Sequence, residues 1–182
     1  MSDPVPASRI VDIPADQLSP AQAAVLEKLS EGRGRIPTPY KVWVHSAELA
    51  EHLQALGTFL ASRVSLTRRE AEIVILAAAA HWNGDYVFRA HAREAKSVGL
   101  TDEVINATRT NDTVRLDSPR EQVLFDLVKS FVGGTAPDEL FALAVRELGH
   151  GGVAETLALF GYFTSVSLAM KLYRVPPPEK TP

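Results

Sequence analysis

The feature that most constrains the fold of this chain is a series of helix start and stop signals along almost its whole length. Apolar residues recur at three- and four-residue steps, as in Leu49, Leu53 and Leu56, which is the spacing of one helix face. The segments TRRE (67–70) and SPRE (118–121) have the spacing of capping boxes. The sequence shows no alternating strand pattern bounded by hairpin turns. It therefore predicts an all-α fold of seven or eight helices.

Caps and helix-breaking residues set the boundaries of the expected helices. Ser19-Pro20 combines a cap with a proline in the first helical position, where its missing N–H is not needed. Two prolines in the segment 32–45 predict a loop without a regular helix, and Asn83-Gly84 is a turn signal. The expected helices are 20–31, 47–64, 67–82, 85–98, 102–109, 118–132, 137–148 and 153–173.

The composition favours one soluble domain and argues against two classes of partner. A length of 182 residues suits a single domain, 1–182, and we expect extended arms at 1–18 and 174–182. The formal net charge is −3, and neither a dense basic stripe nor a nucleic-acid motif is found, so we expect no nucleic-acid partner. The longest apolar run is too short to span a bilayer and the N-terminus lacks an export pattern. We therefore expect a cytoplasmic protein with no membrane partner.

The chain contains no cysteine. A disulfide, a thiolate nucleophile and a cysteine-ligated metal or iron–sulfur site are therefore excluded. No second histidine stands at metal-ligand spacing from His81. We expect neither a metal nor another cofactor, and a small-molecule substrate.

One stretch, AHWNGDYVFRAH (80–91), gathers histidines, an acid, an arginine and aromatics directly after an apolar run. Glu72 lies 11 residues before Asn83, and His91 lies 8 residues after it. If the chain reverses at Asn83, their heights along an antiparallel helix pair differ by only about 4–5 Å, whereas one continuous helix would separate them by about 28 Å. A carboxylate beside an imidazole fixes its tautomer and raises its proton affinity, which makes an acid/base pair.

Each of these polar residues also has a purely structural interpretation. His91 could be a buried histidine bonded to a backbone carbonyl or to Glu72. Glu72 stands in an apolar helix, where a carboxylate needs a partner, and it could form an interior salt bridge with Arg69 or Arg89. Asp85 could cap the second helix or pair with Arg89 on a solvated face at i,i+4 spacing.

Aromatic and basic residues near this stretch are candidates for lining a substrate pocket. At this spacing the aromatics are either core residues or the wall of a small apolar pocket. The candidate substrate-binding residues are Trp82, Tyr86, Phe88 and Arg89. In the proline-bearing loop, Arg33, Arg35 and Lys41 either neutralise an anionic substrate or form a plain basic surface.

The segment REAEIVILAAAAHWNGDYVFRAHAREAKSVGLTDEVINA resembles the core repeat of the carboxymuconolactone decarboxylase family, which includes the alkylhydroperoxidase D-like (AhpD-like) proteins. Members share an apolar helix headed by arginine and glutamate, a polar turn, a helix that carries a histidine, and a segment of the form GL[ST]-x-E-x-[IV], found in this chain as GLTDEVI. The resemblance is strongest over about residues 65–110 and extends more loosely over the whole chain. It implies an AhpD-like helical bundle that forms a homo-oligomer, either a dimer, a trimer or a hexamer.

The chain departs from two motifs of the family. Peroxidase-type members resemble C-x-x-C-x-x-x-H, and with His91 as the histidine the cysteine positions fall on Gly84 and Val87. Decarboxylase-like members often resemble E-W-x-x-H, which reads V-F-R-A-H in this sequence. His91 itself and Glu72, which matches the proton-relay glutamate of peroxidase-type sites, are retained. Asp85 occupies a position that is often acidic in relatives.

The resemblance implies a cofactor-free acid/base enzyme, a lyase of the decarboxylase type, that acts on a small carboxylated or lactone metabolite. His91 would donate the proton, Glu72 would orient it, and Asp85 or Tyr86 would add a polar contact. The alternative is a non-catalytic ligand-binding or oligomeric member that keeps only the fold. Thiol peroxidase activity is disfavoured because there is no cysteine. An accessible cavity beside Glu72 and His91 favours the enzyme, and a closed site favours the alternative.

The last expected helix, 153–173, is apolar on most of its faces. A helix of this kind is buried on several sides. We expect it to contribute to a subunit contact or to the core beneath that contact.

Overall fold

A computed structural model describes residues 7–31, 34–110 and 112–178 of the chain. These residues form an all-α structure, as the sequence predicts, and contain no β-strand. A short 3₁₀ helix, η1, covers Ala15–Gln17. The α-helices are α1 (Pro20–Ser30), α2 (Thr38–Trp43), α3 (Ala47–Ser62), α4 (Arg68–His81), α5 (Asp85–Ser97), α6 (Asp102–Ala107), α7 (Pro119–Gly133) and α8 (Asp138–Leu172).

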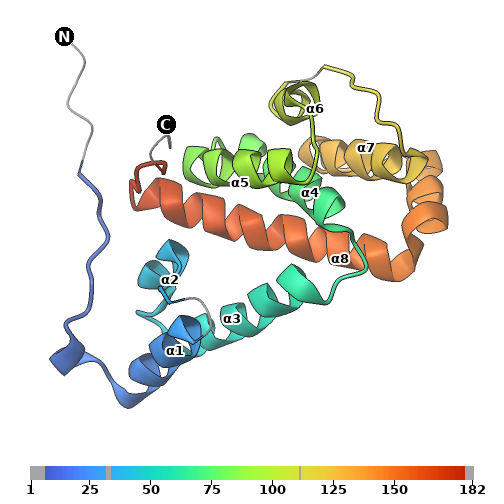
Figure 1. Cartoon of the computed structure of the whole chain (residues 1–182). Helices are drawn as coiled ribbons and strands as arrows, with labels where there is room; N and C mark the ends of the chain where they lie inside the picture. The colour runs from blue at the N-terminus through green and yellow to red at the C-terminus, as the bar shows by residue number, and fades with distance from the viewer. Residues whose placement is uncertain (1–6, 32–33, 111, 179–182) are drawn as a thin grey trace, which may run out of the picture.

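Helix α4 is the centre of the bundle. Every residue from Glu70 to Ala79 is buried, and the helix packs against α5, α7 and α8. Figure 1 shows α8 with α4, α5 and α7 on one side and α3 on the other. Helix α3 also packs against α1. Because α4 is covered on all sides, its apolar run lacks the polar face of a surface helix.

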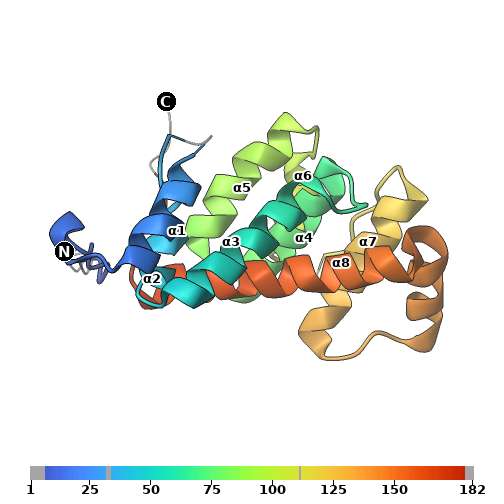
Figure 2. The same ribbon diagram turned by 90° about the horizontal axis from the view of Figure 1, so that it is seen from below.

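Helix α8 bends sharply near its first third, and the bend is visible in Figures 1 and 2. Gly149 has φ 71° and ψ 165° at this point, a backbone conformation that favours glycine. The bend divides the element into two helical segments, which agree with the two helices expected at 137–148 and 153–173.

The prediction of a helix-free loop over 32–45 is wrong, because α2 lies inside it. Pro37 occupies the N-cap of α2 and Pro39 lies in its first turn, where the helix does not use the backbone N–H that proline lacks. Tyr40 and Trp43 are buried on this short helix. The two prolines therefore start a helix and do not prevent one.

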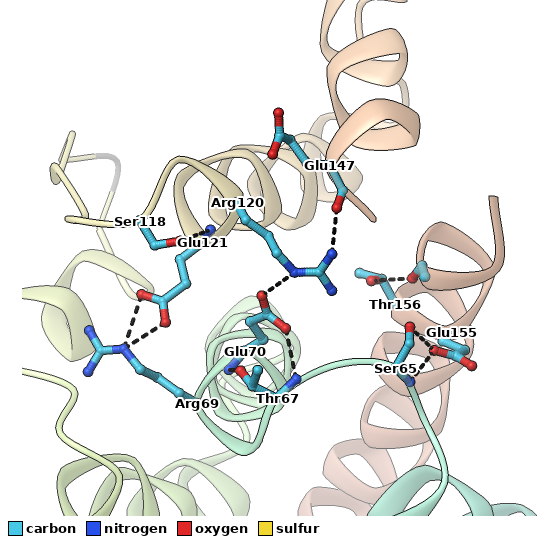
Figure 3. Close-up of polar contacts among 11 residues, drawn as sticks. Ser65, Thr67, Arg69, Glu70, Ser118, Arg120, Glu121, Glu147, Glu155 and Thr156 are labelled. Carbon is cyan, nitrogen blue, oxygen red and sulfur yellow. Dashed lines mark hydrogen bonds and ion pairs between the residues drawn. The ribbon is translucent and has the colours of Figure 1, made fainter. Parts of the chain in front are cut away.

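The N-terminus of α4 is fixed by a capping box that is part of a larger polar cluster (Figure 3). The Thr67 hydroxyl accepts from the Glu70 backbone N–H, and the Glu70 carboxylate accepts from the Thr67 N–H at 2.8 Å. The other carboxylate oxygen of Glu70 accepts from Arg120 Nε at 2.7 Å, and Arg120 Nη1 donates to the Glu147 carbonyl. This cluster ties the start of α4 to α7 and α8.

The second expected capping box is only half formed. The Ser118 hydroxyl accepts from the Glu121 backbone N–H at 3.3 Å. The Glu121 carboxylate does not return to Ser118, because both of its oxygens accept from Arg69 Nε at 2.8 and 3.0 Å (Figure 3). The Arg69 guanidinium on α4 therefore donates to Glu121 in place of the Ser118 backbone N–H.

Helix α8 is the one helix among the described residues that is long and apolar enough to cross a membrane by length and composition. A core helix of a soluble protein meets the same criterion, and 33% of its most apolar window is buried inside the protein. The helix packs against α4, α5 and α7 and leaves Leu157, Leu168 and Leu172 exposed. The absence of a membrane partner stays a prediction.

Arg120→Met is expected to lower the free energy of unfolding by about 3 kcal/mol, because it leaves the buried Glu70 carboxylate without its cationic partner. Arg146→Met is the matched control, since Arg146 is exposed and, among the residues that the structure describes, pairs only with the neighbouring Glu147. The control is expected to change stability by less than about 0.5 kcal/mol. Urea denaturation followed by circular dichroism measures both, and equal effects would contradict the role given to Arg120.

Candidate functional site

A cavity of about 640 Å³ lies among α2, α3, α4, α5 and α8. Its wall combines apolar side chains with a small number of polar ones, which is the usual composition of a small-molecule site. The residues of its wall that matter most for chemistry are Tyr40, Arg68, Tyr86, His91, Tyr162 and Phe163.

The structure brings Glu72 and His91 together at this wall. His91 Nδ1 lies 2.8 Å from Glu72 Oε2. The Glu72 side chain is fully buried behind the wall, whereas the His91 side chain is 21% exposed. The Phe163 ring packs edge-on against the imidazole, with 4.9 Å between the ring centroids. The imidazole is therefore held on two sides, and Nε2 has no hydrogen-bond partner in the described part of the chain.

The chain reversal between α4 and α5 creates this contact. Asn83 adopts a positive φ of 50°, which asparagine tolerates better than most residues. The Gly84 N–H then donates to the Ala79 carbonyl at 2.8 Å. The turn therefore lies where the sequence predicts it and sets α5 beside α4.

Arg68 is the cationic partner of Glu72, and the expected partners Arg69 and Arg89 are not. Arg68 Nη2 lies 3.2 Å from Glu72 Oε1. The Arg69 guanidinium donates hydrogen bonds to Glu121 and to the Gly99 carbonyl, and Arg89 is exposed. Arg68 was not predicted as this partner, although its i,i+4 spacing to Glu72 on one helix is a sequence signal for such a pair.

Only one of the four candidate substrate-binding residues, Tyr86, lines the cavity, and its hydroxyl donates to Thr38 Oγ1 at 3.0 Å. Trp82 is directed elsewhere, with Nε1 donating to Thr164 Oγ1 at 3.1 Å. Phe88 is buried beneath the guanidinium of Arg109, which lies in the connection between α6 and α7. Arg89 is exposed. Tyr86 is therefore the candidate among these four that the cavity wall contains.

Asp85 lies away from the cavity that holds His91. Its carboxylate pairs with Arg109 at 3.0 Å, and the Arg109 guanidinium also stacks on the Phe88 ring at 3.7 Å. Both charges lie beside a second, smaller cavity of about 220 Å³. Asp85 therefore replaces no missing carboxylate next to His91.

Of the basic residues Arg35 and Lys41 in the described part of the segment 34–45, one lines the main cavity. Arg35 lines the cavity, Lys41 pairs with Asp12 at 2.9 Å, and Arg33 lies outside the described residues. Tyr40 and Tyr162 were also missed, and their hydroxyls lie 3.1 Å apart across the wall. These two residues are 122 positions apart in the chain, so no local spacing could have joined them.

The model of the carboxymuconolactone decarboxylase family matches residues 47–130 of the chain. Two solved structures share the fold at low identity. A protein of unknown function from Agrobacterium tumefaciens, provisionally described as the antioxidant defence protein AhpD, is 19% identical with a TM-score of 0.65, covering 75% of this chain and 94% of that one. An uncharacterized peroxidase-related protein from Silicibacter sp. TM1040 is 16% identical with a TM-score of 0.74, covering 99% and 96%. Comparison with curated proteins gives no significant match.

The two positions at which peroxidase-type relatives carry cysteine are occupied by residues that fit closely. Val87 is buried and lines the cavity. A Cβ at Gly84 would lie 2.8 Å from both Cβ and Oγ of Ser167 on α8. The backbone of α5 can therefore approach α8 at this point only because residue 84 has no side chain.

Gly84→Ala is expected to lower the free energy of unfolding by about 1–3 kcal/mol, because the new methyl group collides with Ser167. Gly151→Ala is the matched control, since a Cβ at Gly151 meets nothing within 4 Å and alanine favours the helix. The control is expected to raise stability by up to about 1 kcal/mol. Adding Ser167→Gly is expected to offset the loss in the Gly84→Ala background beyond its own effect, as measured by a double-mutant cycle in urea. Simple additivity would contradict the contact.

Proposed function

We propose that the protein is a cofactor-free acid/base enzyme, a lyase of the decarboxylase type, that acts on a small carboxylated or lactone metabolite. The observation that carries this proposal is the Glu72–His91 pair in the wall of a cavity of about 640 Å³. A cavity of this size next to an oriented imidazole supports an enzyme more than it supports a closed, non-catalytic member of the family.

His91 is the proton donor in this proposal, and Glu72 is its orienting partner. Glu72 accepts from Nδ1, so Nε2 is the ring nitrogen left to exchange a proton with a ligand. The carboxylate also holds the imidazole ring in its orientation, as the aspartate of a catalytic triad does. Tyr86 lines the same cavity and would add a secondary polar contact. Asp85 does not take this role, because its carboxylate pairs with Arg109 outside this cavity.

The reaction class follows from these roles. In a decarboxylation, the bond between the carboxylate carbon and its neighbour breaks, CO2 leaves, and the electron pair remains on the substrate as a dienolate. The proton on His91 Nε2 then passes to a carbon of the dienolate, and the imidazole takes another proton from water. The apolar part of the wall favours the loss of a charged, solvated carboxylate.

The protein is not a cysteine-dependent peroxidase, because the chain has no cysteine to form the required thiolate. This holds although one structural relative is described as peroxidase-related.

His91→Gln is expected to reduce kcat for γ-carboxymuconolactone decarboxylation by about 10²–10⁴-fold, because a proton donor is removed. Glu72→Gln is expected to cause a smaller reduction, since the imidazole remains but loses its orienting carboxylate. His81→Gln is the matched control, because His81 is exposed and lies outside the cavity. The loss of absorbance of the lactone measures turnover, and circular dichroism checks the fold of each variant.

Two outcomes of this assay would count against the proposal. Equal turnover by the wild type and His91→Gln would remove His91 from the reaction. No turnover of this lactone or of related lactone acids by a folded wild-type protein would favour the non-catalytic, ligand-binding alternative.

We also propose that the protein is a cytoplasmic homo-oligomer whose subunits meet through the second part of α8. Leu157 is 53% exposed and Leu168 is 40% exposed on this helix, although the helix also supplies core residues such as Leu159 and Met170. Apolar side chains exposed on a helix that also supplies core residues are typical of a subunit contact.

Leu157→Glu combined with Leu168→Glu is expected to shift the protein toward the monomer, because charged side chains are costly to bury in a contact. Val11→Glu is the control, since Val11 is exposed and belongs to the N-terminal segment, outside α8. Light scattering at micromolar concentration measures the mass of each protein. A monomeric wild type would contradict the oligomer, and an unchanged mass for the double variant would place the contact elsewhere.

A further inference from the structure

Two neighbouring arginines at the start of α4 differ in how fully their guanidinium groups are used. Arg69 donates to both oxygens of Glu121 and to the Gly99 carbonyl. Arg68 lies 3.2 Å from Glu72 Oε1, and its guanidinium makes no hydrogen bond to any other residue in the described ranges. Its side chain is 51% exposed and lines the main cavity. Arg69 is therefore a structural residue, whereas Arg68 lines the cavity and uses only one contact, with Glu72, among the described residues.

The buried carboxylate explains why Arg68 stays at this place without a ligand. Glu72 Oε1 is buried and has no partner in hydrogen-bond geometry, so the nearby Arg68 charge is its compensation. A guanidinium carries five N–H donors. One contact with Glu72 leaves enough donors for a second carboxylate, and a bidentate guanidinium–carboxylate pair is the geometry in which arginine binds most strongly.

Arg68 and His91 flank the same carboxylate. Arg68 is beside Oε1 of Glu72, and His91 Nδ1 is bonded to Oε2. Both side chains line the cavity. A ligand whose carboxylate binds Arg68 therefore has its adjacent atoms close to the imidazole, while Ile75, Leu159 and Phe163 offer apolar surface for its body.

The other charged residues that line the cavity, Arg35 and Glu94, do not share the position of Arg68 beside Glu72. Arg35 is exposed on the loop before α2, and Glu94 is exposed one turn after His91 on α5. Neither contacts Glu72, so neither joins a bound anion to the acid/base pair. Glu94 instead disfavours an anion on its own side of the cavity.

We propose that Arg68 is the specificity-determining residue of the cavity, which binds the carboxylate of an anionic, largely apolar ligand beside His91. This inference deepens the proposed function and rests on it for the site, but it concerns binding and not turnover. It selects a free carboxylate over a neutral lactone or amide as the group that the cavity recognises.

Calorimetric titration with 2-naphthoate and its neutral isostere 2-naphthamide tests the inference. The wild type is expected to bind the carboxylate at least about tenfold more tightly than the amide, because only the carboxylate forms charge-assisted hydrogen bonds with Arg68. Arg68→Met is expected to weaken 2-naphthoate binding by about 10–100-fold and to leave 2-naphthamide binding within about twofold. Arg146→Met is the matched control and is expected to change neither affinity.

Arg68→Lys keeps a positive charge beside Glu72, so it can be titrated in place of Arg68→Met if that variant folds poorly. It is expected to bind 2-naphthoate about 3–10-fold more weakly than the wild type, because lysine lacks the planar two-donor geometry. Equal weakening of both probes in the Arg68 variants would show a merely structural role. A wild type without preference for the carboxylate, including one that binds neither probe, would also overturn the inference. Because no step depends on turnover, a failed decarboxylase assay with an intact carboxylate preference would remove the proposed reaction and leave the Arg68 site in place.

Discussion

The organisation of this protein depends on one fully buried carboxylate in its central helix. Glu72 has no solvent exposure, and its oxygens are matched by Arg68 on the same helix and by His91 on the next. A carboxylate in the interior is tolerated only with such partners. The pairing requires α4 and α5 to run antiparallel and close together, which the turn at Asn83 and the side-chain-free Gly84 allow.

The helices could be predicted from the sequence because caps and periodicity are local signals. Thr67 and Glu70 cap α4 as expected, and Gly149 separates two helical segments of α8. The short α2 was missed because proline in a first turn and proline in a loop have the same local sequence signal. Its buried Tyr40 depends on contacts with α3 and α8, which no local pattern records.

The candidate site was predictable only in part. Helix geometry predicted that Glu72 and His91 lie at similar heights along an antiparallel helix pair. In the structure His91 Nδ1 lies 2.8 Å from Glu72 Oε2. Proximity in sequence was a poor guide for the rest. Asp85 lies six residues before His91 and still faces Arg109, because the direction of a side chain around the helix axis decides which cavity it meets.

In the proposed site, Glu72 holds the imidazole of His91 by Nδ1 and leaves Nε2 for a ligand in the cavity. Nitrogen-15 NMR of the labelled imidazole measures this directly. A hydrogen is expected on Nδ1 that is lost or redistributed in Glu72→Gln, and the Nε2 signal is expected to shift when 2-naphthoate is added. An imidazole with its hydrogen on Nε2, insensitive to both changes, would contradict this arrangement.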